Sequence, residues 1–228
     1  HEIRNPLGSI ELFASLLARD SEDEKNRDRA SLIIHSVKDM DAKISNLLLF
    51  TKRQRPVLKM INVHGVLREI LAFSKQIIDQ EEIVLMVDYD DADPVMEADT
   101  EMLKHLFLNL ILNAMQAMPD GGELSIQTRI STHGGMRTPA GPPHVEIIFG
   151  DTGVGIPYQY ARKIFDPFFT TKERGSGLGL SIVHNIVDIH GGSIHVRENT
   201  KGGSRFTVML PLTGGACRTK LPEKGCGE

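Results

Sequence analysis

Two apolar repeats at the start of the chain limit its fold more than any other feature of the sequence. Apolar residues recur with alternating spacings of four and three at positions 3, 7, 10, 14 and 17, and the same spacing continues at 33, 37, 40, 44, 47 and Thr51. This spacing is typical of the apolar seam of a coiled-coil-like helix. A short charged stretch, 20–26, separates the repeats. The sequence therefore predicts an antiparallel hairpin of two helices, the first over 1–19.

One hairpin alone leaves part of each seam uncovered. Two hairpins packed as a four-helix bundle would cover both seams, so a homodimer through the hairpin is expected. The alternative is a helical arm that packs on its own second domain.

The first seven residues, HEIRNPL, place three polar side chains away from the seam. If Ile3 is a d position, His1, Glu2 and Asn5 fall at b, c and f and project toward solvent. A histidine is a competent nucleophile when a neighbouring base takes its proton. A surface histidine beside a glutamate is often without function, so the rest of the chain must decide what this cluster does.

After a basic, proline-containing linker around Pro56, the pattern changes to mixed α and β. Amphipathic stretches predict helices over 63–80, 100–118 and 178–189, and β-preferring stretches predict strands at 83–89, near 95, and over 123–130, 145–151, 193–197 and 205–211. The predicted fold class is therefore α+β. Its segments are a helical hairpin over 1–55, an α/β domain over 56–212 and a disordered tail over 213–228.

Two patches in the second domain carry groups suited to a nucleotide. Asn109 and Asn113 lie one helical turn apart and off the apolar stripe, so both carboxamides can face one cavity. Asp151 opens the turn DTGVG directly after a predicted strand. Gly153 and Gly155 let this turn approach a flat base, and the carboxylate can accept a hydrogen bond from an exocyclic amine.

Two more patches follow along the chain. The aromatic segment FDPFFTTK ends in Lys172, a candidate phosphate contact, although its phenylalanines can also simply pin a loop to the core. The run GSGLGL contains Gly175, Gly177 and Gly179 and opens a helix, whose exposed N–H groups and positive dipole end favour an anion. No first strand precedes this run and no Gly-Lys-Ser/Thr follows it, so it fits neither a Rossmann turn nor a Walker A loop.

Composition argues against several other classes of protein. The net charge is −4, so nothing suggests a nucleic-acid-binding surface, and no nucleic-acid partner is expected. No apolar run approaches the ~20 residues that span a bilayer, so a cytoplasmic location is expected, with any membrane attachment through segments absent from this chain. The chain starts without Met in what should be a helix, so a fragment is expected. The nine histidines and two cysteines show no metal-ligand spacing, and no structural metal is expected.

HEIRNPL and the four patches, in this order from His1 to about Leu212, resemble two-component sensor histidine kinases. The resemblance implies that His1 receives the γ-phosphoryl group of ATP and that Glu2 serves as its base. It also implies that Asn5 orients water when such a kinase dephosphorylates its partner. FDPFFTTK and the run QAMPDGG look like the nitrogen-regulation-type subgroup.

For the second domain the resemblance implies a Bergerat-type ATP-binding fold, an α/β sandwich with helices on one face of a mixed sheet. In that family, the residue at Asn113 ligates Mg²⁺, the one at Asn109 lies close to the phosphates, and Asp151 reads the adenine amino group. The implied ATP contacts also include Gly153, Gly155, Lys172, Gly175, Gly177 and Gly179. Gln116 departs from the lysine found at this point in many sensor kinases, and no role is assigned to it.

The resemblance thus implies an ATP- and Mg²⁺-dependent, autophosphorylating histidine kinase that passes its phosphoryl group to an aspartate of a response-regulator receiver domain. Two alternatives stay open. An ATP-hydrolysing switch of the same fold lacks its water-activating glutamate, because Asn109 stands at that position. A nucleotide-binding scaffold is at odds with the intact motifs.

Overall fold

The structure is a computed structural model that describes residues 4–21, 23–51, 56–131, 143–172, 176–212 and 217–218. The chain divides into two compact units, His1–Gln54 and Arg55–Glu228. Within the described ranges, no helix combines the length and the apolar character needed to cross a membrane.

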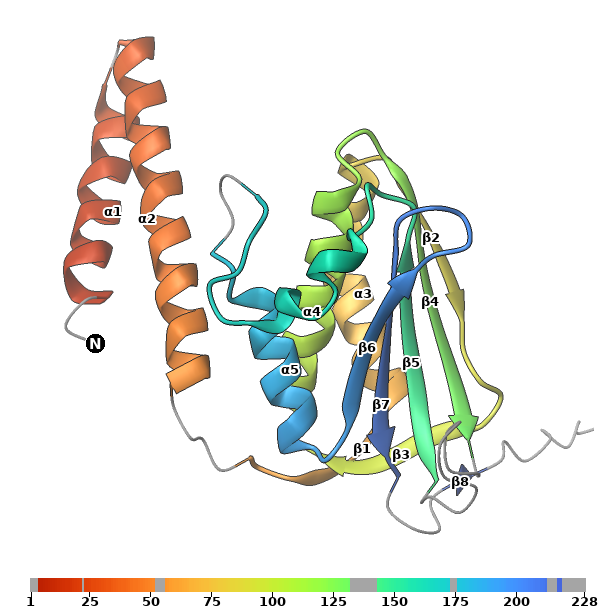
Figure 1. Ribbon diagram of the computed structural model, residues 1–228. Coiled ribbons are helices and arrows are strands. Elements are labelled where there is room, and N and C mark those ends of the chain that lie inside the picture. The colour runs from red at the N-terminus through yellow and green to blue at the C-terminus, as the bar shows by residue number, and fades with distance from the viewer. Residues whose placement is uncertain are drawn as a thin grey trace, which may run out of the picture. The chain divides into compact units, whose positions relative to one another are not determined.

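The first unit is a hairpin of two helices, α1 Arg4–Asp20 and α2 Glu24–Thr51, which lie side by side (Figure 1). Asp23 begins the second helix. Its Oδ1 accepts a hydrogen bond from the N–H of Lys25 at 3.0 Å, and its carbonyl accepts one from the N–H of Arg27 at 3.1 Å. A short polar side chain that binds the free N–H groups of a first turn favours a helix start at this point. The hairpin confirms the N-terminal helices predicted from the two repeats.

The hairpin buries only part of each predicted seam. The buried seam residues and their neighbours are Leu7, Ala14, Ala30 and Val37. The exposed seam residues are Ile10, Leu17, Ile33 and Met40, which are between 42% and 53% exposed. Each helix therefore uses one part of its apolar stripe inside the hairpin and leaves another part in contact with water.

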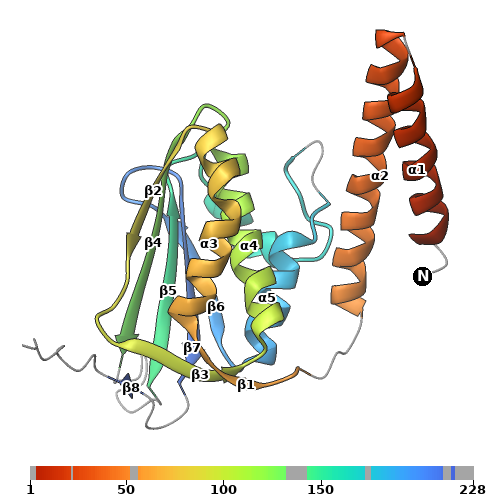
Figure 2. The ribbon, with the colours of Figure 1, turned by 180° about the vertical axis from the view of Figure 1, so that it is seen from behind.

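The second unit is built on a five-stranded mixed sheet of order β2-β4-β5-β7-β6. The strands are β2 Ile83–Asp88, β4 Gly122–Ser131, β5 His144–Asp151, β6 Ser193–Glu198 and β7 Ser204–Pro211. β2 runs parallel to β4, and the other neighbours are antiparallel. The helices α3 Val63–Gln80, α4 Thr100–Ala117 and α5 Gly179–Ile189 cover one face of the sheet (Figures 1 and 2). This arrangement confirms the predicted α/β sandwich.

A second, three-stranded sheet has the order β1-β3-β8 and is antiparallel. Its strands are β1 Lys59–Asn62, β3 Asp93–Ala98 and β8 Cys217–Arg218. The sequence pattern does not predict β1. β8 lies in the segment expected to be a disordered tail, and its two residues pair with Asp93 and Pro94. The rest of that segment lies outside the described residues.

α4 packs between α3 and α5 in the helical layer. Its predicted apolar stripe is buried along its length, from Leu103 through Phe107 to Met118. Phe107 packs on Phe149 of β5, with the ring centroids 5.9 Å apart. Because this stripe fixes the rotation of the helix, it also fixes which polar residues of α4 face away from the sheet.

Asp99 joins three segments at the start of α4. Its carboxylate accepts hydrogen bonds from the N–H groups of Val57, Glu101 and Met102 at 2.8, 3.0 and 3.1 Å, so Asp99 caps the helix. Its own N–H donates to Nε2 of His190, at the end of α5, at 3.0 Å. Burial acts to raise the pKa of Asp99, but the three N–H groups outweigh it and the pKa is lowered.

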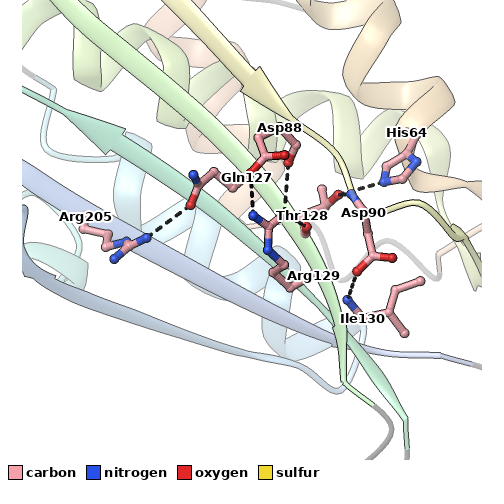
Figure 3. A network of polar contacts seen from close by, with 8 residues as sticks. All are labelled: His64, Asp88, Asp90, Gln127, Thr128, Arg129, Ile130 and Arg205. Carbon is pink, nitrogen blue, oxygen red and sulfur yellow. Dashed lines mark hydrogen bonds and ion pairs between the residues drawn. The ribbon is translucent and has the colours of Figure 1, made fainter.

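His64 lies in a buried polar network between α3, β3 and β4, and Figure 3 shows the part of it around Thr128 and Asp90. Its Nε2 lies 2.8 Å from Oγ1 of Thr128, and its Nδ1 lies 3.2 Å from Oδ1 of Asp93. The Thr128 hydroxyl oxygen also accepts from the N–H of Asp90 at 2.9 Å, and Tyr89 stacks on the imidazole at 4.6 Å. A neutral imidazole satisfies this geometry, with Nδ1–H donating to Asp93 and Nε2 accepting from the Thr128 hydroxyl.

Acid is expected to destabilise the second unit through His64. Burial lowers the pKa of His64, against the opposing effect of Asp93. The unfolded state therefore binds more protons as pH falls below the unfolded value of ~6.5, and stability is lost in that range. Urea unfolding between about pH 7.5 and about pH 5.5 measures this loss, because all three tyrosines lie in the second unit and their fluorescence reports on it. His64→Gln should flatten the pH dependence, and an unchanged slope in this variant would contradict the assignment.

Candidate functional site

The structure describes most of the residues predicted for a functional site. α4 carries Asn109 and Asn113, β5 ends at Asp151, and α5 begins at Gly179. His1, Glu2 and Gly175 lie outside the described residues, and Asn5 is described only through the helical backbone of α1. The described candidates of the second unit gather around one end of α4 and the start of α5.

Asp151 is a buried carboxylate, only 3% exposed, at the end of the central strand β5. Its Oδ1 accepts hydrogen bonds from the N–H groups of Gly153 at 2.9 Å and Ser204 at 3.1 Å. Its backbone carbonyl accepts from Nδ2 of Asn199 at 2.7 Å. Burial raises the pKa of Asp151, while the two N–H groups act in the opposite direction. Because both side-chain bonds fall on Oδ1, Oδ2 is the oxygen that can accept a hydrogen bond from a ligand.

The glycines after Asp151 allow close packing of the turn. A Cβ atom on Gly153 would lie 2.3 Å from the carbonyl oxygen of Ala117, at the end of α4, and the N–H of Val154 donates to that same oxygen at 3.1 Å. Gly155 has a φ of +73°, a conformation that favours glycine. The absence of a side chain at 153 therefore serves the contact between this turn and α4.

Asn109 and Asn113 both lie against the first residue of α5. A Cβ atom on Gly179 would be 3.0 Å from Oδ1 of Asn109 and 3.7 Å from Nδ2 of Asn113. The Nδ2 of Asn109 donates to the carbonyl of His105, one turn back, at 2.8 Å. The two carboxamides and the positive end of the α5 dipole thus share one place, which is suited to an anion.

The aromatic segment before α5 is only partly fixed to the core. Phe165 and Phe169 pack against the core, whereas Phe168 is 63% exposed and has a φ of +66°. Gly177 lies directly on the backbone of Phe168, and a Cβ atom there would be 2.4 Å from the Phe168 carbonyl carbon. The expectation that phenylalanines pin this loop therefore holds for two of the three.

Lys172, at the end of the aromatic segment, contacts α4. Its Nζ donates to Oε1 of Gln116 at 2.7 Å. Protein atoms around the ammonium lower the pKa of Lys172 by desolvation, and the negative charge of Asp151 opposes this effect. The sequence does not single out the contacts made by Gln116, Asn199 and Ser204, because each joins segments far apart in the chain.

The described residues hold no group of three or more His, Cys, Asp or Glu side chains that could bind a metal ion by themselves. A cation held by one carboxamide oxygen together with ligand phosphates needs no such group, because Mg²⁺ in nucleotide sites takes few protein ligands. The side-chain oxygen of Asn113, which lies beside the start of α5, can serve as that single protein ligand.

Two family models match the chain. Residues 98–214 match the model described as histidine kinase-, DNA gyrase B-, and HSP90-like ATPase. Residues 1–56 match the model of the His kinase A (phospho-acceptor) domain.

Similar proteins include kinases from two bacteria. The sensor histidine kinase ZraS of Escherichia coli K12 is 35% identical over 213 residues, covering 93% of this chain and 44% of ZraS. Sporulation kinase A of Bacillus subtilis 168 is 32% identical over 212 residues, covering 92% of this chain and 33% of that kinase. The chain thus spans less than half the length of either relative.

Among solved structures, the histidine kinase ThkA in complex with the response regulator protein TrrA is similar, with a TM-score of 0.69 and 27% identity over 93% of this chain and 59% of the ThkA chain. Full-length ShkA in complex with AMPPNP has a TM-score of 0.79 over 96% of this chain and 45% of ShkA. Its identity of 22% supports the fold alone.

Proposed function

The chain belongs to the histidine kinase-, DNA gyrase B- and HSP90-like ATPase family, and on this premise we propose that it is the kinase core of a two-component signalling system. The observation that carries the proposal is that a phospho-acceptor domain stands ahead of the ATPase domain in the same chain. The sensor histidine kinase ZraS aligns across both parts. The proposed activity is ATP-dependent phosphorylation of His1.

In this proposal the second unit binds ATP with Mg²⁺. The Oδ2 atom of Asp151 accepts a hydrogen bond from the adenine amino group, because Oδ1 already accepts hydrogen bonds within the protein. The phosphates lie at the start of α5, beside Asn109 and Asn113, where helix N–H groups and carboxamides meet. Asn113 is the proposed Mg²⁺ ligand. The remaining proposed phosphate contacts are Lys172 and the glycines Gly175, Gly177 and Gly179.

The proposed reaction moves one phosphoryl group. A ring nitrogen of His1 attacks the γ-phosphorus, a P–N bond forms, the bond from that phosphorus to the β–γ bridging oxygen breaks, and ADP leaves. Glu2 takes the proton from the other ring nitrogen. The bound Mg²⁺ supplies charge neutralisation on the phosphate oxygens. The phosphoryl group then passes to an aspartate of a receiver domain, as the complex of ThkA with a response regulator supports.

Two finer assignments rest on sequence motifs. FDPFFTTK and QAMPDGG support membership of the nitrogen-regulation-type subgroup. Asn5 supports a response-regulator phosphatase activity, in which its carboxamide orients the attacking water.

Labelling tests the proposal directly. Incubation of the chain with γ-labelled ATP and Mg²⁺ should label His1, and the label should survive alkali but be lost in acid, because a phosphorylated histidine has these stabilities. Release of ADP over many turnovers without label would instead indicate an ATP-hydrolysing switch. ATP binding without label or turnover would indicate a scaffold.

The exposed part of the hairpin seams supports dimerisation, with a second hairpin covering it in a four-helix bundle. Ile33→Glu is therefore expected to convert the dimer to monomer, because it places a charge in the apolar contact between hairpins. Sedimentation equilibrium measures the change, and Ser31→Glu, on the same helix but off the seam, should remain dimeric. A dimer that survives Ile33→Glu would contradict this interface.

A further inference from the structure

The bond between Lys172 and Gln116 joins the aromatic segment to α4. The ammonium donates to Oε1 of Gln116 at 2.7 Å. The two residues are 56 positions apart in the chain, and Gln116 belongs to α4 whereas Lys172 does not. Gln116 has no role in the proposed function.

Gln116 places the ammonium near the site of the phosphates. It lies three residues after Asn113 on α4, so the two side chains occupy neighbouring positions on one face of the helix. The carbonyl oxygen of the next residue, Ala117, accepts a hydrogen bond from the N–H of Val154, in the turn after Asp151. Gln116 therefore stands between the carboxamide proposed for Mg²⁺ and the turn proposed for adenine.

A second group acts on the ammonium electrostatically. Desolvation lowers the pKa of Lys172, and the negative charge of the buried Asp151 carboxylate opposes this effect. A lysine side chain is long and flexible, so without a fixed acceptor the ammonium has no defined position.

We propose that Gln116 is a positioning residue that holds the Lys172 ammonium on the asparagine face of α4, where it meets the phosphates of a nucleoside triphosphate. This inference rests on the proposed nucleotide site. Its structural basis is the exposed, neutral side chain at 116 that accepts a hydrogen bond from the cation of the aromatic segment.

Calorimetric binding of ATP to the full chain tests the proposal. Gln116→Met, which keeps the length and helix preference of the side chain but removes the acceptor, should weaken ATP binding about tenfold, as should Lys172→Met. The double variant should bind no worse than either single variant, because both remove the same interaction. Gln76→Met, the same change on the surface of α3, is the matched control and should bind like the unmodified chain.

A pH series separates positioning from a structural role. Loss of ATP affinity at alkaline pH should follow deprotonation of Lys172. Gln116→Met should make that loss smaller, because an ammonium that is no longer held beside the phosphates contributes less to binding. Lys172→Met should remove it. A Gln116 that only stabilises α4 would leave the pH profile unchanged.

Wild-type affinity in Gln116→Met, or additive losses in the double variant, would overturn the proposal. The outcome is independent of phosphoryl transfer, since binding alone is measured. A chain that binds ATP without labelling His1 would refute the kinase function and still decide the role of Gln116. Absence of ATP binding by the unmodified chain would overturn both.

Discussion

Replacing His1 with glutamine is expected to abolish incorporation of label from γ-labelled ATP while leaving ATP affinity unchanged. Glutamine keeps a polar side chain of similar reach but has no nitrogen lone pair that can attack phosphorus. The site that binds ATP is proposed to lie wholly in the second unit. Filter-based labelling together with calorimetric ATP binding measures both halves of this expectation.

His35 of α2 provides the matched control. It is an exposed histidine of the same hairpin, so His35→Gln repeats the chemical change without touching the proposed acceptor. This variant should label like the unmodified chain. Full labelling of His1→Gln would show that another residue accepts the phosphoryl group.

Asp151→Asn is expected to reduce ATP affinity on the order of a hundredfold and to abolish labelling as a consequence. The carboxamide oxygen can still accept the N–H groups of Gly153 and Ser204, so the turn keeps its hydrogen bonds. The NH₂ group of the asparagine then replaces Oδ2, so two hydrogen-bond donors face each other where the carboxylate accepted a bond from the adenine amino group. Loss of a hydrogen bond to a charged acceptor, at about 1.5–3 kcal/mol, accounts for a change of this size.

The fold of this variant must be checked separately. Tyrosine fluorescence during urea unfolding should give a similar midpoint for Asp151→Asn and the unmodified chain, because the carboxamide occupies the same space. Asp120→Asn, in the exposed turn after α4, is the control for the charge change and should bind ATP normally. Normal ATP affinity in Asp151→Asn would exclude this residue from the adenine site.

Local patterns account for most of the fold. α3 spans the predicted 63–80, and α4 begins at the predicted residue 100, because amphipathic spacing is set by neighbouring residues. β1 shows the limit of this reasoning. It has four residues without a clear alternation, and it exists because Lys59 and its neighbours pair with β3. Such a strand depends on its partner rather than on its own sequence.

The candidate site also contains residues that local sequence patterns predict and contacts that they do not predict. The asparagines of α4 and the glycines after β5 stand out because their spacing is regular and short. The contacts of Lys172 with Gln116, of Asn199 with Asp151 and of His64 with Thr128 span 56, 48 and 64 positions. No periodicity within one element predicts a hydrogen bond of that separation, so only the packed structure reveals it.

Asp99 is hydrogen-bonded to three separate segments of the second unit. The same carboxylate caps α4 and accepts a hydrogen bond from the N–H of Val57, while the N–H of Asp99 donates to Nε2 of His190, directly after α5. Replacement of the Asp99 side chain would therefore disturb the start of α4 and the attachment of Val57 together. The bond to His190 would remain, because every residue except proline supplies the backbone N–H.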